Sequence, residues 1–335
     1  MTNSIDPQRT LKDPSSELPS ADATVSTNLF EIIPIPAFND NYIWLLVTPE
    51  IPTSVSTAAS SSLQPSAPLS AMAGLRDAIV VDPGQAQPVI DVLEARGLRL
   101  SAILLTHHHN DHVGGVAQLL AHAAQSAGQG GSGALSSLPV YGPAGEEIAH
   151  LTQKLVGGDT VVVASPSARF TVIDVPGHTR GHIAFYAAAA TPGTVAEVAP
   201  QPPRVFCGDT LFATGCGRLF EGTPAQMLTS LDRLAALPPE TQVHCAHEYT
   251  LSNIAFALAC DGDNADLQAW EADAKALRAR GAPTVPTTLA HELRVNPFLR
   301  VDQPAILTRL EAHEGHVPQD RLEAFTALRA WKDRF

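Results

Sequence analysis

The chain has 335 residues, of which 44% are hydrophobic and 16% are charged, and its formal net charge is −13. A chain of this length and apolar content can bury a sizeable core, in two domains or in one domain with an appendage. The acidic charge argues against nucleic acid as a partner, because its phosphates would be repelled, and no apolar run reaches the roughly 18 residues that a membrane span needs.

Residues 1–28 are polar and rich in Ser, Pro and Asp, which is typical of a disordered extension. This stretch lacks the basic and apolar regions of a secretory signal, and acidic residues such as Asp6 and Glu17 disfavour a transit peptide. The four cysteines are scattered and form no Cys-x-x-Cys pair. We therefore expect reduced thiols and a cytoplasmic protein.

Between residues 29 and 247, short β-branched runs alternate with helical patterns, which indicates a layered α/β fold. A helix is predicted at 116–124, and another at 224–237, where Thr223 is a typical N-cap and Pro224 occupies the first position. The predicted strands are 29–35, 42–47, 78–82, 102–106, 160–163, 170–175, 183–186, 204–207 and 242–245.

Three stretches rich in Ala, Ser, Gly or Pro, at about 52–74, 122–137 and 189–203, are predicted to be inserted surface loops. After His247 the pattern changes to helices without a convincing strand. These helices are predicted at 251–260, 266–280, 288–294 and 319–335. We therefore place a domain boundary near residue 248, between a domain of 29–247 and a small helical domain of 248–335.

Residues 106–112, with the sequence THHHNDH, follow the apolar run 102–105 and precede Gly114 and Gly115. This pattern indicates a buried strand that ends at a loop, which is where layered α/β folds bind ligands. Imidazole and carboxylate groups suit zinc, iron or manganese. Protonated histidines this close together would repel one another, and a cation removes that repulsion. The segment therefore predicts a metal site at a strand end.

Four further segments place metal-binding residue types at the end of an apolar run. A single His or Asp after a strand is more often structural, so each segment alone indicates little. Their joint occurrence with the histidine cluster predicts one centre assembled from several strand ends. The residues concerned are Asp82, His178, His182, Asp209, His244 and His247.

In chain order these residues give a T-H-x-H-x-D-H motif, then a His, an Asp and a final His, and the chain resembles the metallo-β-lactamase superfamily. The resemblance narrows to the hydroxyacylglutathione hydrolase (glyoxalase II) family and covers about 29–335. It implies a four-layer αβ/βα sandwich with a small C-terminal helical domain that binds substrate. The family-specific segments are GDTLF at 208–212, GCGRLFEGT at 215–223, HEYT at 247–250, PTVPTTL at 283–289, NPFLR at 296–300 and KDRF at 332–335.

The resemblance implies two divalent metal ions per chain, zinc in the first place, with iron or manganese as the alternatives. Asp209 would bridge the two ions together with a water or hydroxide, so Asp111 and Asp209 are the expected catalytic residues. His108, His182 and His244 are not expected to be ligands. The implied ligand sets are His107, His109 and His178 for the first metal, and Asp111, His112 and His247 for the second.

The substrate implied by the resemblance is S-D-lactoylglutathione or a similar acylglutathione thioester, which is hydrolysed to D-lactate and glutathione in methylglyoxal detoxification. An acidic monomer must meet the two carboxylates of glutathione with local cations. Arg329 and Lys332, three residues apart on the last predicted helix, offer a fork and a point charge for that purpose. The implied substrate-binding residues are Arg218, Leu219, Phe220, His247, Tyr249, Arg329 and Lys332.

Two other functions stay open on the sequence. A mononuclear iron persulfide dioxygenase of the same fold would use only His107, His178 and Asp209, and the 215–223 segment and the helical tail favour the hydrolase over it. The other is a metal-stabilised binding protein without turnover, for which no sequence feature argues. No Gly-x-Ser-x-Gly element is present, and none is needed for hydrolysis at a metal.

Overall fold

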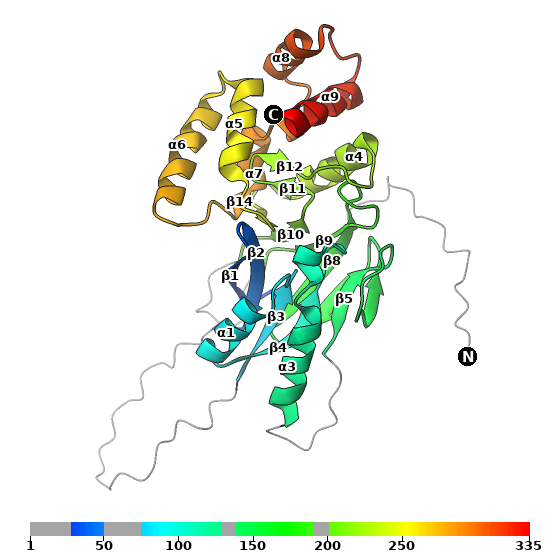
Figure 1. Cartoon of the computed structure of the whole chain (residues 1–335), viewed down its shortest axis with the longest axis vertical. Coiled ribbons are helices and arrows are strands. Elements are labelled where there is room, and N and C mark those ends of the chain that lie inside the picture. The colour runs from blue at the N-terminus through cyan, green and yellow to red at the C-terminus, as the bar shows by residue number, and fades with distance from the viewer. Residues whose placement is uncertain (1–27, 50–74, 129–137, 191–200) are drawn as a thin grey trace, which may run out of the picture.

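The computed structural model describes residues 28–49, 75–128, 138–190 and 201–335 (Figure 1). The predicted extension 1–28, except for its last residue, and the predicted loop 52–74 lie outside the described residues. The predicted loop 122–137 begins too early, because helix α3 continues to Gly128. The predicted loop 189–203 is described only at its ends, where Ala190 and Gln201 form an antiparallel bridge.

Two six-stranded mixed sheets form the centre of the molecule, with strand orders β1-β2-β3-β4-β5-β6 and β14-β13-β10-β9-β8-β7. The first consists of β1 (Glu31–Ala37), β2 (Asn41–Val47), β3 (Arg76–Val81), β4 (Leu98–Leu104), β5 (Val140–Pro143) and β6 (Gln153–Leu155). The second consists of β7 (Thr160–Val163), β8 (Ala168–Asp174), β9 (Ile183–Ala187), β10 (Arg204–Gly208), β13 (Gln242–Cys245) and β14 (Thr287–Thr288). A separate hairpin pairs β11 (Leu211–Phe212) with β12 (Gly215–Cys216).

Helices cover the outer face of each sheet. Alternate residues of β2 divide between two cores: Ile43 and Leu45 pack with helices α1 (Gln87–Arg96) and α3 (Val116–Gly128), whereas Trp44 and Leu46 face the second sheet. Helix α4 (Pro224–Ala235) packs on the far side of the second sheet. It begins at Thr223 with a complete capping box, as predicted, because Thr223 and Gln226 exchange hydrogen bonds. The expected four-layer αβ/βα sandwich is confirmed.

The C-terminal segment is helical but not purely so. The prediction of no strand after His247 is wrong, because β14 pairs antiparallel with β13 and extends the second sheet. Helix α8 was also missed, although Pro304 at its first position and the left-handed Gly315 after its end are the usual signals. None of the described helices is long and apolar enough to cross a bilayer. The helices are α5 (Thr250–Asp261), α6 (Ala265–Ala279), α7 (Leu289–Val295), η2 (Pro297–Leu299), α8 (Pro304–Glu314) and α9 (Arg321–Arg334).

The strand directions bring the polar loops together. Strand β3 runs parallel to β4 in the first sheet, and β10 runs parallel to β13 in the second. The carboxyl ends of parallel strands meet at one edge of a sheet, where α/β folds place their ligands. Asp82 follows β3, the 106–112 segment follows β4, Asp209 follows β10 and His247 follows β13.

Phe170 of β8 tests the packing between the sheets. Its side chain is 0% exposed and contacts the rings of Phe30, Phe185 and Phe206. We expect Phe170→Ala to lower the free energy of unfolding in urea by about 3–5 kcal/mol, because it leaves a cavity in a close-packed core. The control Val162→Ala on neighbouring β7, whose side chain is 57% exposed, should change it by no more than about 0.5 kcal/mol. Equal losses in the two variants would contradict this packing.

Candidate metal centre

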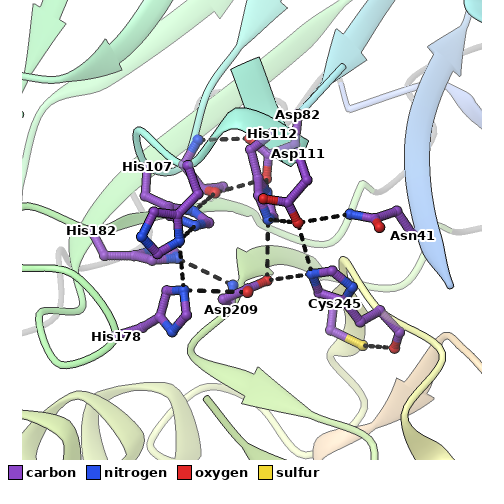
Figure 2. A network of polar contacts seen from close by, with 12 residues as sticks. Asn41, Asp82, His107, Asp111, His112, His178, His182, Asp209 and Cys245 are labelled. Carbon is purple, nitrogen blue, oxygen red and sulfur yellow. Dashed lines mark hydrogen bonds and ion pairs between the residues drawn. The ribbon is translucent and has the colours of Figure 1, made fainter. Parts of the chain in front are cut away.

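The seven predicted ligands converge at the edge where the two sheets meet. His107, Asp111 and His112 come from the loop and short helix after β4, His178 from the loop between β8 and β9, and Asp209 from the turn after β10 (Figure 2). The other two are His109 and His247. All except His109 and Asp111 are buried.

Three histidine nitrogens form the first triad. Nε2 of His107 lies 3.1 Å from Nδ1 of His109, which lies 3.0 Å from Nε2 of His178. Ligands at about 2.0–2.1 Å from a tetrahedral metal are separated by about 3.3 Å, so these nitrogens surround a space of the size a metal ion needs.

One carboxylate and two imidazoles form the second triad. Oδ2 of Asp111 lies 3.5 Å from Nε2 of His112 and 3.4 Å from Nε2 of His247. Asp209 stands between the triads: its Oδ2 is 3.3 Å from Nε2 of His178, and its Oδ1 is 3.4 Å from His112 and 3.3 Å from His247. One carboxylate oxygen therefore faces each triad, which is the arrangement of a bridging ligand.

Two buried atoms show that this space suits a cation. Nε2 of His112 and Oδ1 of Asp209 make no hydrogen bond, although both are removed from solvent. An unsatisfied buried polar atom is costly, and both atoms point toward the second triad, where a metal ion would satisfy them. The donor set contains imidazole and carboxylate and no thiolate. Together with the fold, the paired clusters indicate a binuclear metal site.

The remaining nitrogen of three of these imidazoles is held by an oxygen atom. Nδ1 of His112 contacts Oδ2 of Asp82 at 3.0 Å, and Nδ1 of His178 contacts the carbonyl oxygen of Arg218 at 2.9 Å. Nδ1 of His247 contacts Oδ1 of Asp40 at 2.9 Å. Such contacts fix the tautomer and the direction of a metal-binding imidazole. Asp82 therefore orients the loop that carries His112.

Three orienting residues were missed from the sequence. Asp40 holds His247, and Asn41 donates from Nδ2 to Oδ2 of Asp111 at 3.1 Å. The signal was a run of polar residues, 39–41, at the turn between two apolar strands. Glu146 lies 3.0 Å from Nδ1 of His108, and Glu221 lies 3.4 Å from its Nε2, so both nitrogens of that ring face carboxylates outside the triads.

His182 and His244 lie beside the triads, and the ring of His182 stacks on that of His107 at a centroid distance of 4.5 Å. Nε2 of His182 accepts a hydrogen bond from the backbone N–H of Asp209 at 3.1 Å, which anchors that residue. His244 packs between the rings of Trp44 and Phe206, at centroid distances of 4.6 and 5.0 Å. Both fit the predicted roles outside the ligand set.

The residues expected to bind substrate differ in their accessibility. Phe220 is 62% exposed at the rim of the first triad, with its ring centroid 5.2 Å from that of His178. The Tyr249 ring is stacked 4.6 Å from the ring of His247. Arg218 is exposed, Leu219 packs partly against the core, and Nζ of Lys332 donates to the carbonyl of Ser252 at 3.1 Å.

Arg329 is not the exposed cation that the sequence predicted. Its side chain is only 4% exposed, its Nη1 donates to the carbonyl of Cys216 at 2.9 Å, and its Nη2 contacts Asp333 at 2.9 Å. Position on the helix places Arg329 near Lys332, but tertiary packing turns its guanidinium into the protein. This burial argues against its predicted role as a partner for a substrate carboxylate.

The charges within the centre balance one another. Burial lowers the pKa of His112 and of His247, but the Asp209 carboxylate and its neighbours outweigh burial and raise them to about 10 and about 11. Burial raises the pKa of Asp209, but His247 and His112 outweigh it and hold that pKa well below its usual range. Burial lowers the pKa of His107, His109 and His178. Without a metal, the protons therefore sit on the second triad.

These pKa values predict that metal binding at pH 7 releases protons. His112 and His247 are protonated there in the metal-free protein and must be neutral to bind a cation, so we expect release of about two protons per chain. Calorimetric zinc titrations in buffers of different ionisation enthalpy measure this number. A binding enthalpy that does not depend on the buffer would contradict the expectation.

Comparisons with known proteins cover nearly the whole chain. Residues 248–335 match the family described as Hydroxyacylglutathione hydrolase C-terminus, and residues 73–247 match the Metallo-beta-lactamase superfamily. A protein of Cupriavidus taiwanensis named hydroxyacylglutathione hydrolase is 50% identical over 307 residues, which span 92% of this chain and 100% of that protein. One from Photobacterium profundum with the same name is 44% identical over 90% of this chain and 98% of its own. The crystal structure of ETHE1 from Myxococcus xanthus shares the fold, with a TM-score of 0.50, 21% identity, and coverage of 91% and 99%.

Proposed function

The chain belongs to the hydroxyacylglutathione hydrolase family of the metallo-β-lactamase superfamily, and on this basis we propose that it hydrolyses S-(2-hydroxyacyl)glutathione thioesters. S-D-lactoylglutathione would give D-lactate and glutathione, the second step of methylglyoxal detoxification. The observation that carries the proposal is the Asp209 carboxylate, which has one oxygen toward each of two ligand triads. The same geometry argues against a binding protein that merely uses metal for stability, since one buried carboxylate joining two ligand triads is the arrangement that a binuclear hydrolytic centre requires.

We assign two divalent metal ions to the site, zinc in the first place. The ligands would be His107, His109 and His178 for one ion, Asp111, His112 and His247 for the other, and Asp209 for both. Cations in these positions would polarise a thioester carbonyl and lower the pKa of a bound water toward neutrality.

The side chains around the triads would orient the reactants. Asp111 is held by the Asn41 amide and by His247, so its carboxylate has a fixed direction from which it can accept a hydrogen bond from the attacking water. Asp209 would hold that water at the midpoint of the site. Phe220 and Tyr249 flank the histidines with exposed rings and would restrict the entry of bulk water. The leaving group is a thiolate of moderate basicity, so no general acid is required.

A small cluster of cations in the acidic protein would bind the glutathione moiety. Burial in the first place, together with the charges of Arg329 and Arg218, lowers the pKa of Lys332 to about 8. Arg218 and Lys332 are the members that reach the surface. We assign them to a substrate carboxylate, Tyr249 and His247 to the peptide portion, and Leu219 and Phe220 to packing. We also propose 248–335 as the substrate-binding domain and 29–247 as the catalytic domain, in a monomer.

The decisive experiment combines a hydrolysis assay on S-D-lactoylglutathione with metal analysis of the same sample. We expect thioester turnover without O₂ and two metal ions per chain. His112→Ala should remove one ion and lower kcat on the order of 100-fold or more, since a ligand contributes more than the residues that orient it.

The matched control is His108→Ala, which lies in the same loop but faces Glu146 and should keep both ions and nearly full kcat. A mononuclear iron dioxygenase would give a different pattern: one iron per chain, consumption of O₂, and an ion that survives His112→Ala. That pattern would refute the proposal.

Substitutions of Lys332 and Arg329 should have different effects, one on substrate binding and the other on stability. Lys332→Ala should raise KM about 10-fold with little change in kcat, because it removes a charge-assisted hydrogen bond to the substrate. Arg329→Ala should instead lower the free energy of unfolding by about 1–3 kcal/mol and leave KM near the wild-type value, because it orphans the buried Cys216 carbonyl. Steady-state kinetics and urea unfolding of both variants measure the difference. An unchanged KM in Lys332→Ala would remove this residue from the binding site.

A further inference from the structure

The hairpin β11–β12 connects two parts of the metal centre through the backbone. It begins two residues after Asp209 and ends two residues before Arg218, whose carbonyl accepts the hydrogen bond from Nδ1 of His178. At its base, the N–H of Gly217 donates to the carbonyl of Thr210 at 3.1 Å. The position of the hairpin therefore determines the position of the Arg218 carbonyl, and through that hydrogen bond the orientation of the His178 ring.

The turn of this hairpin is held from outside. Thr214 has a φ of +59°, in the left-handed region that non-glycine residues rarely adopt. Its N–H donates to Oε2 of Glu292 at 2.8 Å, and its Oγ1 accepts from Nε1 of Trp270 at 3.0 Å. Both partners belong to the C-terminal helices, α7 and α6.

Asn296, directly after α7, joins the two strands of the hairpin. Its Nδ2 donates to the carbonyls of Phe212 at 3.2 Å and of Gly215 at 3.0 Å, and it also contacts Oε2 of Glu292 at 2.9 Å. Asn296 and Glu292 are both 0% exposed, so bulk water does not compete for these hydrogen bonds. Two further contacts are those of Asn253 with the Ala213 carbonyl and of Arg329 with the Cys216 carbonyl.

We propose that Asn296, acting with Glu292, is a positioning residue that transmits the packing of the C-terminal helices to the first triad. Without the Asn296 amide, the buried carbonyls of Phe212 and Gly215 keep only the hydrogen bonds that they accept across the hairpin, and the hairpin and the Arg218 carbonyl shift. The His178 ring then loses its orientation. The inference rests on the proposed function, because it assumes that His178 binds a metal used in the reaction.

The second triad is oriented by different residues from those that orient the first. Its orienting partners are Asp82, Asp40 and Asn41, which come from the first sheet and its loops and make no hydrogen bond with the hairpin among those of the described residues. Asp209 has its own anchor in His182. The hairpin meets the second triad through the Phe212 ring, 5.8 Å from the ring of His247, and not through a hydrogen bond that orients a ligand. Loss of the Asn296 amide should therefore affect mainly the first triad.

The test compares full-length Asn296→Ala with wild type. We expect zinc affinity at the first site to fall about 10-fold in competition titrations with a chelator, while affinity at the second site is unchanged. We expect kcat to fall by a similar factor with KM within about twofold, since no substrate contact is removed. In spectra of histidine-labelled protein, the Nδ1–H resonance of His178 should be displaced.

The matched control is Asn264→Ala, in the same C-terminal segment. Asn264 caps α6 by accepting from the N–H of Leu267 at 3.2 Å and does not touch the hairpin. Its loss should lower the melting temperature by a few degrees without changing the metal affinities, kcat or the His178 resonance. Glu292→Gln keeps an oxygen for the Thr214 N–H and should retain most of the first-site affinity. If Asn296→Ala does not fold, Asn253→Ala, which removes only the bond to the Ala213 carbonyl, should give the same pattern to a smaller extent.

An Asn296→Ala protein that melts at a lower temperature but keeps first-site affinity and the His178 resonance overturns the proposal, as does equal weakening of both sites. These readouts do not depend on turnover. A wild-type protein that binds two metals but leaves the thioester intact refutes the proposed function, while the affinity and resonance measurements still decide the inference.

Discussion

The carboxylate of Asp209 is the interaction on which the centre depends. Five imidazoles and a second carboxylate gather at one edge of the sandwich, and the carboxylate of Asp209 has one oxygen toward each triad. Its negative charge favours cations on either side of it, whether these are protons on His112 and His247 or metal ions. Burying a carboxylate is costly unless it is paired, and here the pairing is built from four different strand ends.

This arrangement explains why many of the surrounding residues orient the ligand side chains and take no part in the reaction themselves. The residues around the expected ligands contact the atoms that face away from the centre. Asp82 and Asp40 contact Nδ1 of imidazoles, and His182 accepts a hydrogen bond from the backbone N–H of Asp209. A metal site tolerates small errors in ligand position poorly, so outer contacts contribute strongly to affinity. The C-terminal helices are connected to these contacts by hydrogen bonds to the β11–β12 hairpin.

The features that could be predicted from the sequence are those that depend on residues close together in the chain. The metal-binding residue types at the strand ends, the capped helix at Thr223 and the apolar strands follow from residue type and spacing. The family resemblance added the sandwich and the division of the expected ligands between two ions. Contacts between distant segments could not be predicted in the same way. Asp40 reaches His247 across 207 positions, and the burial of Arg329 depends on a carbonyl 113 residues away. Short elements such as β14 were also missed, because two residues carry no periodicity and their pairing is fixed by the neighbouring strand.

The pairing of β14 with β13 also has a consequence for biosynthesis. Strand β13 carries His247 at its end, and on its outer side it has no partner until residues 287 and 288 have left the ribosome. A nascent chain that stops before this point exposes a hydrogen-bonding edge that can pair with another chain. Completion of the second sheet is thus coupled to synthesis of the C-terminal segment, and a shortened chain risks aggregation. The two-residue length of β14 then leaves the finished sheet with little free edge.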